Sequence, residues 1–287
     1  MKNSKIGWTD HTWNVARGCH RITEECKFCY MYRDSERYNS YDPNSPVSTS
    51  EATMKKPYSK AFRDKKLDNG SRPLIFTSSL TDIFLDELDT QRERIWKTMK
   101  DNQDLVFLVL TKRPERITDH LPEDWGDGYE NVWLGTSVGL QKNLHRAHKL
   151  LEAPSRHYFI SVEPMIGEMD LESEGHLKRD WRTIPDGKNH LDWVIVGGES
   201  GNDNGKWNYR PCQLDWIEKV VEQCQASGTP VFVKQLGTYL GKGLNSSRHG
   251  DDIIQFPINI QIREFPEFDS NKNEINNRIK KFKKLKK

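Results

Sequence analysis

Short apolar segments recur along the chain, separated by longer segments in which apolar residues return every three or four positions. The short segments are rich in Val, Ile, Leu and aromatic residues and do not alternate strictly with polar ones. This pattern is typical of strands buried on both faces of a parallel sheet. It predicts strands at residues 12–15, 74–77, 105–110, 132–134, 157–162, 193–196 and 231–233.

Helical periodicity separates several of these strands, at residues 91–102, 140–153 and 213–227. The last of these patterns ends at Gly228, with Pro230 beyond it, which is a common way for a helix to stop. Regular alternation of strands and helices favours repeated βαβ units with right-handed crossovers. We therefore predict an α/β fold, a partial or complete TIM-like (β/α) barrel.

The predicted elements divide the chain into a barrel and two C-terminal segments. Residues 1–240 form the barrel, with an insertion at about 32–72 whose part rich in Ser, Pro and Asn, 39–49, reads as a surface loop. Residues 172–189 are polar and form a second insertion. Residues 241–271 are expected to be a cap or edge segment, and residues 272–287 a basic tail.

The formal net charge of +2 hides an asymmetry. Residues 272–287 contain eight Lys or Arg and one acidic residue, which leaves 36 basic and 41 acidic residues in the rest of the chain. Basic tails often contact nucleic-acid phosphates without reading sequence. The alternative is a solvated helix end.

Cysteine usage and hydropathy bear on the cellular compartment. Five cysteines in 287 residues do not form a disulfide scaffold, and we expect Cys212 and Cys224 to be packed or surface thiols. Neither a leader-like apolar segment after a basic start nor a run long enough to cross a membrane is present in the sequence. The sequence predicts a reduced, cytoplasmic protein without membrane contact.

The other three cysteines, Cys19, Cys26 and Cys29, lie close together near the N-terminus. Three thiolates can hold three irons of a 4Fe-4S cluster and leave the fourth iron open for S-adenosylmethionine (SAM). Radical SAM loops usually have an aromatic residue directly before the last cysteine, and Phe28 is in this position here. The spacing differs, because three residues usually separate the first two cysteines, whereas six separate Cys19 from Cys26 in this chain. A zinc site completed by His11 or His20 is one alternative, and unrelated cysteines are another.

Polar residues follow most of the predicted strands. Because the carboxyl ends of parallel strands meet on one face of a barrel, where active sites are built, we expect these residues to surround the cysteines. They are Ser78, Ser79, Thr81, Asp82, Thr111, Lys112, Arg113, Thr136, Ser137, Ser161, Glu163, Glu199, Ser200, Lys234 and Gln235. We also expect Trp8, Asp10 and Trp13 at or near this rim, although core packing alone explains the tryptophans.

Each of these residues has a simpler explanation. Glu163 precedes Pro164 and can merely end a strand in a rigid turn. The Gly197-Gly198 pair can be a flexible turn rather than a point of close approach to a ligand. Lys112 and Lys234 can be surface lysines, although both directly follow strands that read as buried.

Several motifs in one order, over about 230 residues, resemble the three-cysteine-motif proteins of phages and bacteria, a radical-SAM-like family of unknown substrate. The residues that carry the resemblance are Gly7-Trp8-Thr9-Asp10, Thr12-Trp13-Asn14, Gly18-Cys19, Cys26, Cys29-Tyr30, Ser79, Asp82-Ile83-Phe84, Leu110-Thr111-Lys112-Arg113-Pro114, Trp133-Leu134-Gly135-Thr136-Ser137-Val138, Ile160-Ser161-Val162-Glu163-Pro164, Val194-Ile195-Val196-Gly197-Gly198-Glu199-Ser200-Gly201 and Phe232-Val233-Lys234-Gln235-Leu236-Gly237. The insertion at 32–72 and the basic tail depart from it.

The resemblance implies an enzyme in which Cys19, Cys26 and Cys29 bind a 4Fe-4S cluster that cleaves SAM reductively, giving a radical that attacks a substrate. The implied cofactor-binding residues are Phe28, Tyr30, Ser78, Ser79, Thr111, Ser137, Glu163 and Glu199. Candidate catalytic residues are Lys112, Glu163 and Lys234, and Arg113 would face anionic groups. Implied partners are a reductant of the flavodoxin or ferredoxin type and a three-Cys-motif partner protein.

Two other functions stay open at this point. One is a zinc-stabilised protein that binds or processes nucleic acid, and the other is an inactive radical-SAM-like scaffold for a partner. For an active enzyme, the basic tail favours a nucleic acid or nucleotide as substrate, with a peptide as the next choice.

Overall fold

A computed structural model describes residues 3–39, 41–68, 71–173, 175–177, 189–244, 247 and 249–268. Its centre is one sheet of seven parallel strands in sequential order, β1-β4-β5-β6-β7-β8-β9. The strands are β1 (His11–Trp13), β4 (Leu74–Thr77), β5 (Val106–Thr111), β6 (Val132–Ser137), β7 (Tyr158–Met165), β8 (Trp193–Gly198) and β9 (Val231–Gln235). All seven predicted strands are present.

The sheet is open, because β1 and β9 are its two edge strands. The fold is therefore a partial barrel and not the complete barrel that the sequence also allowed. A separate two-stranded sheet pairs β2 (Ala16–Arg17) with β3 (Val47–Ser48). This short antiparallel pair ties the insertion after β1 to the start of the chain.

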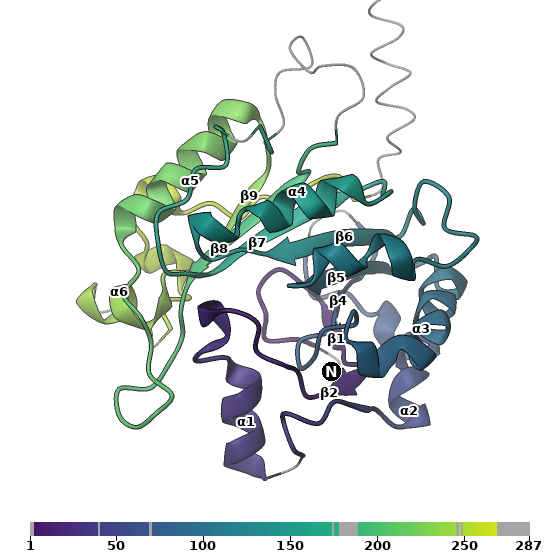
Figure 1. The fold of residues 1–287 in the computed structure, drawn as a ribbon. Coiled ribbons are helices and arrows are strands. Elements are labelled where there is room, and N and C mark those ends of the chain that lie inside the picture. Colours follow the sequence, from purple (N-terminus) through teal and green to yellow (C-terminus); the bar gives the residue numbers. More distant parts are fainter. Residues whose placement is uncertain are drawn as a thin grey trace, which may run out of the picture.

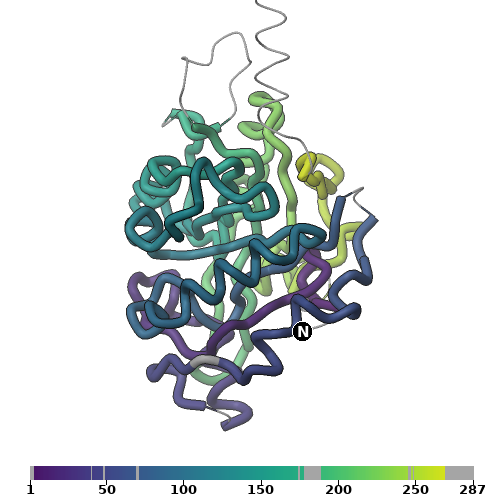
Figure 2. Tube along the Cα trace, turned by 90° about the vertical axis from the view of Figure 1, so that its right-hand side faces the viewer, coloured from purple at the N-terminus to yellow at the C-terminus, as the bar shows by residue number. Residues whose placement is uncertain are grey.

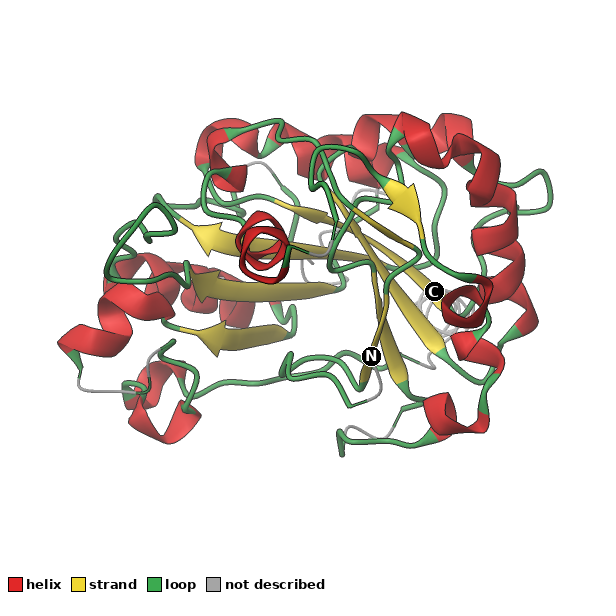
Figure 3. Ribbon diagram, turned by 90° about the horizontal axis from the view of Figure 1, so that it is seen from below, coloured by secondary structure: helices red, strands yellow, loops and turns green. Residues whose placement is uncertain are grey.

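Helices cover the outside of the strands. Helix α3 (Asp89–Asp101) connects β4 to β5, α4 (His145–Glu152) connects β6 to β7, and α5 (Leu214–Ser227) connects β8 to β9. Figure 1 shows these three helices beside the sheet, with α1 (Tyr30–Tyr38) standing apart below the strands. Viewed from below, helices lie along the upper and right sides of the strand layer (Figure 3). Helix α5 ends where the sequence predicted, at Gly228 in the left-handed conformation (φ 69°).

Two apolar clusters lie on the two faces of the sheet. The outer cluster packs strand residues such as Val109 and Val196 against Ile95, Ala147 and Val220 of the helices. The inner cluster fills the concave face with aromatic rings: Trp8, Phe76, Trp133, Phe159, Trp193, Phe232 and Phe268. Alternate residues of one strand enter opposite clusters, as the pleat requires. Side chains facing inward nearer the carboxyl ends are polar, and this is where a site can form.

The C-terminal described segment closes the inner cluster. After α6 (Gly237–Gly243), it runs through two short 3-10 turns, Ile253–Gln255 and Ile258–Ile260. Phe265 and Phe268 then pack on Trp193 at ring-centroid distances of 5.6 Å. In Figure 2, this yellow segment lies near the purple N-terminal segment, which contributes Trp8 to the same cluster. The segment is an irregular cap with a single antiparallel bridge, Phe232 to Arg263.

The insertion after β1 contains more local structure than the sequence indicated. It holds most of α1, then β3, helix α2 (Glu51–Met54) and two 3-10 turns, Lys56–Tyr58 and Lys60–Arg63. Its anchors are Met54 and Phe62, which enter the outer cluster. The polar insertion at 172–189 falls largely outside the described residues, and the basic tail at 272–287 lies wholly outside them.

Candidate active site

The three cysteines lie on one loop, residues 18–30, which we call the cysteine loop. It follows β1 and β2, makes a 3-10 turn at Glu24–Cys26, and enters α1 directly after Cys29. All three thiols are partly exposed, whereas Cys212 and Cys224 are buried elsewhere. Since β1 delivers this loop to the carboxyl ends of the strands, the cysteines lie on the face where barrel sites form.

Glu25 fastens the cysteine loop to the segment after β6. Its carboxylate is almost fully buried and accepts hydrogen bonds from the Gly139 backbone N–H (2.7 Å), Asn143 Nδ2 (2.9 Å) and Arg146 Nη1 (2.6 Å). Arg146 also donates to the Ser137 carbonyl. A buried carboxylate is stable only with such partners. The sequence analysis did not identify Glu25 or Arg146, because neither carries a signal without the fold.

The segment after β4 supports the other side of the loop. Asn14 Oδ1 accepts from the Ser79 and Leu80 backbone N–H groups at 2.7 and 3.1 Å, and Ser78 Oγ donates to the Trp13 carbonyl. Tyr30 Oη donates to the Ser79 carbonyl at 2.6 Å. Ser78 and Ser79 are thus built into the joint between the first two strands of the sheet.

A buried ion pair links the cysteine loop to β5. Arg113 Nη1 lies 3.1 Å from Asp82 Oδ2 and 3.9 Å from Cys19 Sγ, while its Nη2 donates to the His20 carbonyl at 3.0 Å. The Asp82 carboxylate also accepts from the Thr111 hydroxyl at 2.7 and 2.8 Å. Thr111 therefore fixes the Asp82 carboxylate, which in turn orients Arg113 toward the Cys19 sulfur.

Polar side chains of β7 and β9 meet on the concave side of the sheet. Lys234 Nζ lies 3.0 Å from Glu163 Oε1, and the second Glu163 oxygen accepts nothing from the described part of the chain. Lys112 follows β5, and its ammonium is close enough to favour the charged form of the Cys29 thiol. It has no carboxylate partner among the described residues. Lys112 therefore lies near the cysteine loop, and Glu163 and Lys234 pair with each other at the same end of the sheet.

Glu199 is already paired. Arg210 Nε and Nη2 donate to its two oxygens at 2.9 and 2.5 Å, and Arg210 Nη1 donates to the Glu24 carbonyl of the cysteine loop at 2.7 Å. The Arg210 guanidinium also lies 5.5 Å from the centre of the Phe28 ring. Glu199 thus acts on the loop through Arg210, a residue that the sequence analysis missed because it lies in an irregular segment after β8.

The Gly197-Gly198 pair approaches protein rather than leaving room for a ligand. A Cβ on Gly197 would lie 2.6 Å from Glu163 Oε1, and one on Gly198 would lie 2.2 Å from the Leu236 carbonyl oxygen. The close contacts at Gly197 and Gly198 are therefore with the neighbouring strands and the segment after β9, and approach to a ligand stays a prediction. The absence of a side chain at these two positions lets β8 lie close to the Glu163 side chain of β7 and to the segment at the end of β9.

The expected positions of Trp8 and Asp10 were wrong. Both precede β1, so they lie at the amino ends of the strands, opposite the cysteine loop. Asp10 accepts from the Lys66, Leu67 and Leu74 backbone N–H groups at 2.6–2.8 Å, which makes it a structural carboxylate. Trp8 belongs to the inner cluster, and Trp13 to the outer one. Packing alone accounts for both tryptophans.

The two histidines proposed as a fourth zinc ligand are engaged elsewhere. His11 Nδ1 accepts from the Asn3 N–H at 3.0 Å and His11 Nε2 donates to the Asp64 carbonyl at 2.7 Å. His20 Nε2 pairs with Glu87. In the described part of the chain, no three His, Cys, Asp or Glu side chains are placed to hold one metal ion.

The chemistry of the cysteine loop fits an iron-sulfur cluster. Three free cysteines on one loop are a suitable donor set for a four-iron cluster, in which each thiolate would bind one of three irons. Burial and the Asp82 carboxylate raise the pKa of Cys19 to about 12, against the effect of Arg113. Burial also raises the pKa of Cys29, against the effect of Lys112. These two thiols are therefore neutral without a metal, and Arg113 and Lys112 would offset part of the negative charge of thiolates bound to a cluster.

The sequence comparison identifies the family. A family model described as "Protein of unknown function (DUF5131)" matches residues 3–281, and the chain belongs to this family. No curated protein matches the chain.

Solved structures of spore photoproduct lyase are similar to the chain at low identity. A mutant with bound AdoMet and dinucleoside spore photoproduct is 12% identical, with a TM-score of 0.43, and a lyase complexed with dinucleoside spore photoproduct is 14% identical, with a TM-score of 0.42. Each match covers 68% of this chain and 57% of the lyase. The chain therefore spans little more than half the length of these neighbours.

Proposed function

We propose that the protein is a radical SAM-type enzyme, in which Cys19, Cys26 and Cys29 hold a 4Fe-4S cluster. The observation that carries the proposal is the position of the cysteine loop. Three uncommitted thiols follow the first strand of a parallel partial barrel, at the end of the sheet where Lys112, Glu163 and Lys234 gather. The motifs shared with radical-SAM-like three-cysteine proteins point to the same chemistry.

Cys19, Cys26 and Cys29 would hold the cluster, which would supply the one-electron chemistry for reductive cleavage of SAM. The chain's own residues would bind and orient SAM and the substrate. The Glu163 oxygen that Lys234 leaves free can accept from a ribose hydroxyl or an amine. Lys112 can neutralise a carboxylate, and the joint at Ser78 and Ser79 presents backbone groups beside the loop.

The aromatic inner cluster below the site, together with the residues that hold the cysteine loop in place, would exclude water from the site. Glu25, Asp82 and Glu199 each fix the cysteine loop through an arginine or an amide. We assign Phe28 and Tyr30 to the adenine side of the site, since both border Cys29. Thr111 and Ser137 support the site from the ends of β5 and β6.

The proposed substrate is a nucleic acid or nucleotide, on the basis of the basic tail at residues 272–287. Partners in the proposal are a flavodoxin- or ferredoxin-type reductant and a three-Cys-motif partner protein. A cluster sensitive to oxygen suits the reducing cytoplasm, which we propose as the location. No helix in the described part of the chain is long and apolar enough to cross a membrane.

Anaerobic reconstitution with iron and sulfide tests the function. We expect a brown protein with broad visible absorption that cleaves SAM to 5′-deoxyadenosine when reduced. A colourless protein holding one zinc would contradict the proposal, and a brown protein that never cleaves SAM would indicate a scaffold. Incubating the active protein with DNA, tRNA and the partner, followed by mass spectrometry, then identifies the substrate.

A further inference from the structure

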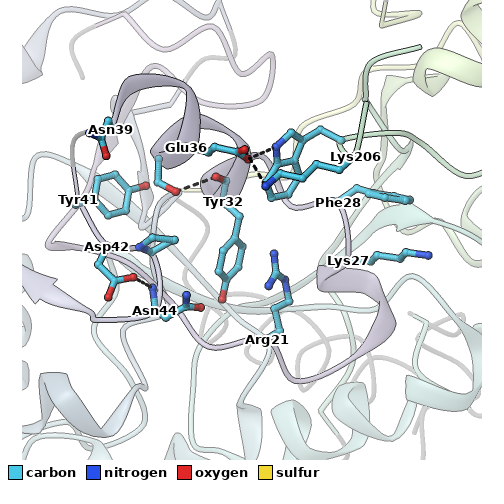
Figure 4. A pocket seen from close by; sticks show the side chains of 13 residues that line it. Arg21, Lys27, Phe28, Tyr32, Glu36, Asn39, Tyr41, Asp42, Asn44 and Lys206 are labelled. Atoms are coloured by element: carbon cyan, nitrogen blue, oxygen red, sulfur yellow. Dashed lines mark hydrogen bonds and ion pairs between the residues drawn. The ribbon is translucent and has the colours of Figure 1, made fainter. Parts of the chain in front are cut away.

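A groove of about 840 Å³ lies beside the cysteine loop. Its walls are Arg21, Lys27 and Phe28 of the loop, Tyr32, Ser35 and Glu36 of α1, Asn39 and the segment 41–44, and Lys206 and Trp207 of the β8–α5 connection. Figure 4 shows the Tyr32 side chain beside Arg21, and Glu36 joined to Lys206 by a dashed line. The volume suits one or two nucleotides.

Aromatic rings and cations are interleaved along this groove. The Arg21 guanidinium lies 3.7 Å from the centre of the Tyr32 ring, Lys206 Nζ lies 5.4 Å from the Trp207 ring, and Lys27 Nζ lies 5.1 Å from the Phe28 ring. Just outside the lining, the Arg17 guanidinium lies 5.8 Å from the Tyr41 ring. Alternating flat rings and positive charges are what successive bases and phosphates require.

The two carboxylates of the groove are already satisfied. Glu36 accepts from Trp207 Nε1 at 2.6 Å and pairs with Lys206 Nζ at 2.8 Å, while Asp42 accepts from the Asn44 N–H and the Ser45 hydroxyl. Arg21 and Lys27 have no carboxylate partner in the described ranges. Arg21 and Lys27 therefore outnumber the single groove carboxylate that lacks a cation partner among the described residues, Asp42, which leaves an excess positive charge for an anionic ligand. Glu36 is neutralised by Lys206 and holds Trp207 in place.

The groove is also joined to the candidate active site. Arg21 Nε donates to the Cys26 carbonyl at 3.4 Å, and the Tyr32 hydroxyl donates to the Cys19 carbonyl. A ligand in the groove would therefore contact the cysteine loop from outside, while Lys112 and Glu163 approach from the sheet.

We propose that this groove binds a single-stranded nucleic-acid segment, stacking bases on Trp207 and Tyr41 and pairing phosphates with Arg21 and Lys27. It holds a substrate strand beside the cysteine loop. The inference rests on the proposed function only in calling the strand a substrate. An acidic protein surface needs cations but no exposed rings in a groove of this size, so the aromatic faces favour nucleic acid.

Fluorescence anisotropy with a fluorescein-labelled 12-nucleotide single strand, as DNA and as RNA, tests the proposal on the full chain. We expect Trp207→Ala to weaken binding about five- to 150-fold, the range measured for loss of one base stack. Trp207→Phe keeps a ring and should bind within a few-fold of the wild type. Arg21→Gln should reduce the slope of log K against log salt by about 0.7, since one phosphate contact is lost. Lys149→Gln, an exposed charge on α4, is the control.

Three results would contradict the proposal that the groove binds single-stranded nucleic acid. They are no binding by the wild type, equal binding by wild type and Trp207→Ala, and competition by AMP as effective as that by the unlabelled strand. Loss of reductant binding in Arg21→Gln with unchanged nucleic-acid binding would assign the surface to a protein instead. An assay of SAM cleavage in the absence of nucleic acid tests the proposed enzyme activity independently of the proposed nucleic-acid groove. An active Trp207→Ala enzyme that binds like the wild type refutes only the groove, and a cluster-free protein that binds through Trp207 refutes only the enzyme.

Discussion

Arg113 Nη1 lies 3.9 Å from the sulfur of Cys19, and the buried carboxylate of Asp82 holds it there. Hydrogen bonds and charges near cysteine sulfurs set the potential of an iron-sulfur cluster. In the proposed enzyme, this pair is therefore a means of tuning electron uptake rather than a general stabilising contact.

We expect Arg113→Gln to lower the midpoint potential of the cluster and Asp82→Asn to raise it, because the reduced cluster carries one more negative charge. The shift should be on the order of 50 mV, or about 1 kcal/mol. An anaerobic redox titration monitored by electron paramagnetic resonance measures it. The double variant should return close to the wild-type potential, and equal shifts of the same sign in both single variants would contradict the assignment.

Cluster content should depend on three side chains only. Replacing Cys19, Cys26 or Cys29 by Ala removes a ligand of one iron and should remove most of the visible absorption. Cys212→Ala and Cys224→Ala are the matched controls, because both thiols are buried away from the loop. A full cluster in Cys26→Ala would refute the ligand set.

Breaking the Glu25–Arg146 pair should destabilise the fold. Glu25→Ala leaves a buried guanidinium without its carboxylate, and we expect a loss of about 3–5 kcal/mol in the free energy of unfolding. Urea unfolding of the apoprotein measures the loss. Glu24→Ala removes the neighbouring, exposed carboxylate, whose ion pair with Lys142 is screened by solvent, and should cost far less stability. Similar losses for the two variants would mean that the buried pair has no special role.

His11 should make stability depend on pH. Burial lowers the pKa of His11 below its ordinary value, and its Nδ1 already accepts the Asn3 N–H, so protonation must break that bond. A base with a lowered pKa in the folded state favours folding above its unfolded pKa, about 6.5, and this contribution is lost as the pH falls. Unfolding free energies at pH 7.5 and 5 should therefore differ less in His11→Gln than in the wild type. His145→Gln, an exposed histidine on α4, should keep the wild-type difference.

Deleting residues 278–287 should weaken nucleic-acid binding and flatten its salt dependence if the basic tail contacts phosphates. Each lost contact reduces the log–log slope by about 0.7–0.9. SAM cleavage without substrate should not change, because the tail follows all the barrel strands. Unaltered binding and slope would identify the tail as a solvated end and remove the main sequence-based reason for a nucleic-acid substrate.

Sequence alone determined the strands, the main helices and the position of the cysteine loop. Apolar runs such as residues 193–196 are buried whatever the details of packing, and Gly228 ends α5 through local backbone preference. The polar residues after the strands could also be placed, since the carboxyl ends of parallel strands share one face. Local pattern was sufficient for all of these features.

Tertiary structure decided which of those polar residues are free and which are engaged. Glu199 is held by Arg210, eleven positions later, and Glu25 by Arg146, far away in sequence. Gly197 is small because Glu163 lies against it. The groove lined by Arg21, Tyr32 and Trp207 also exists only once α1 and the β8–α5 connection lie side by side. Such contacts join residues with no common local pattern, so only packing in three dimensions specifies them.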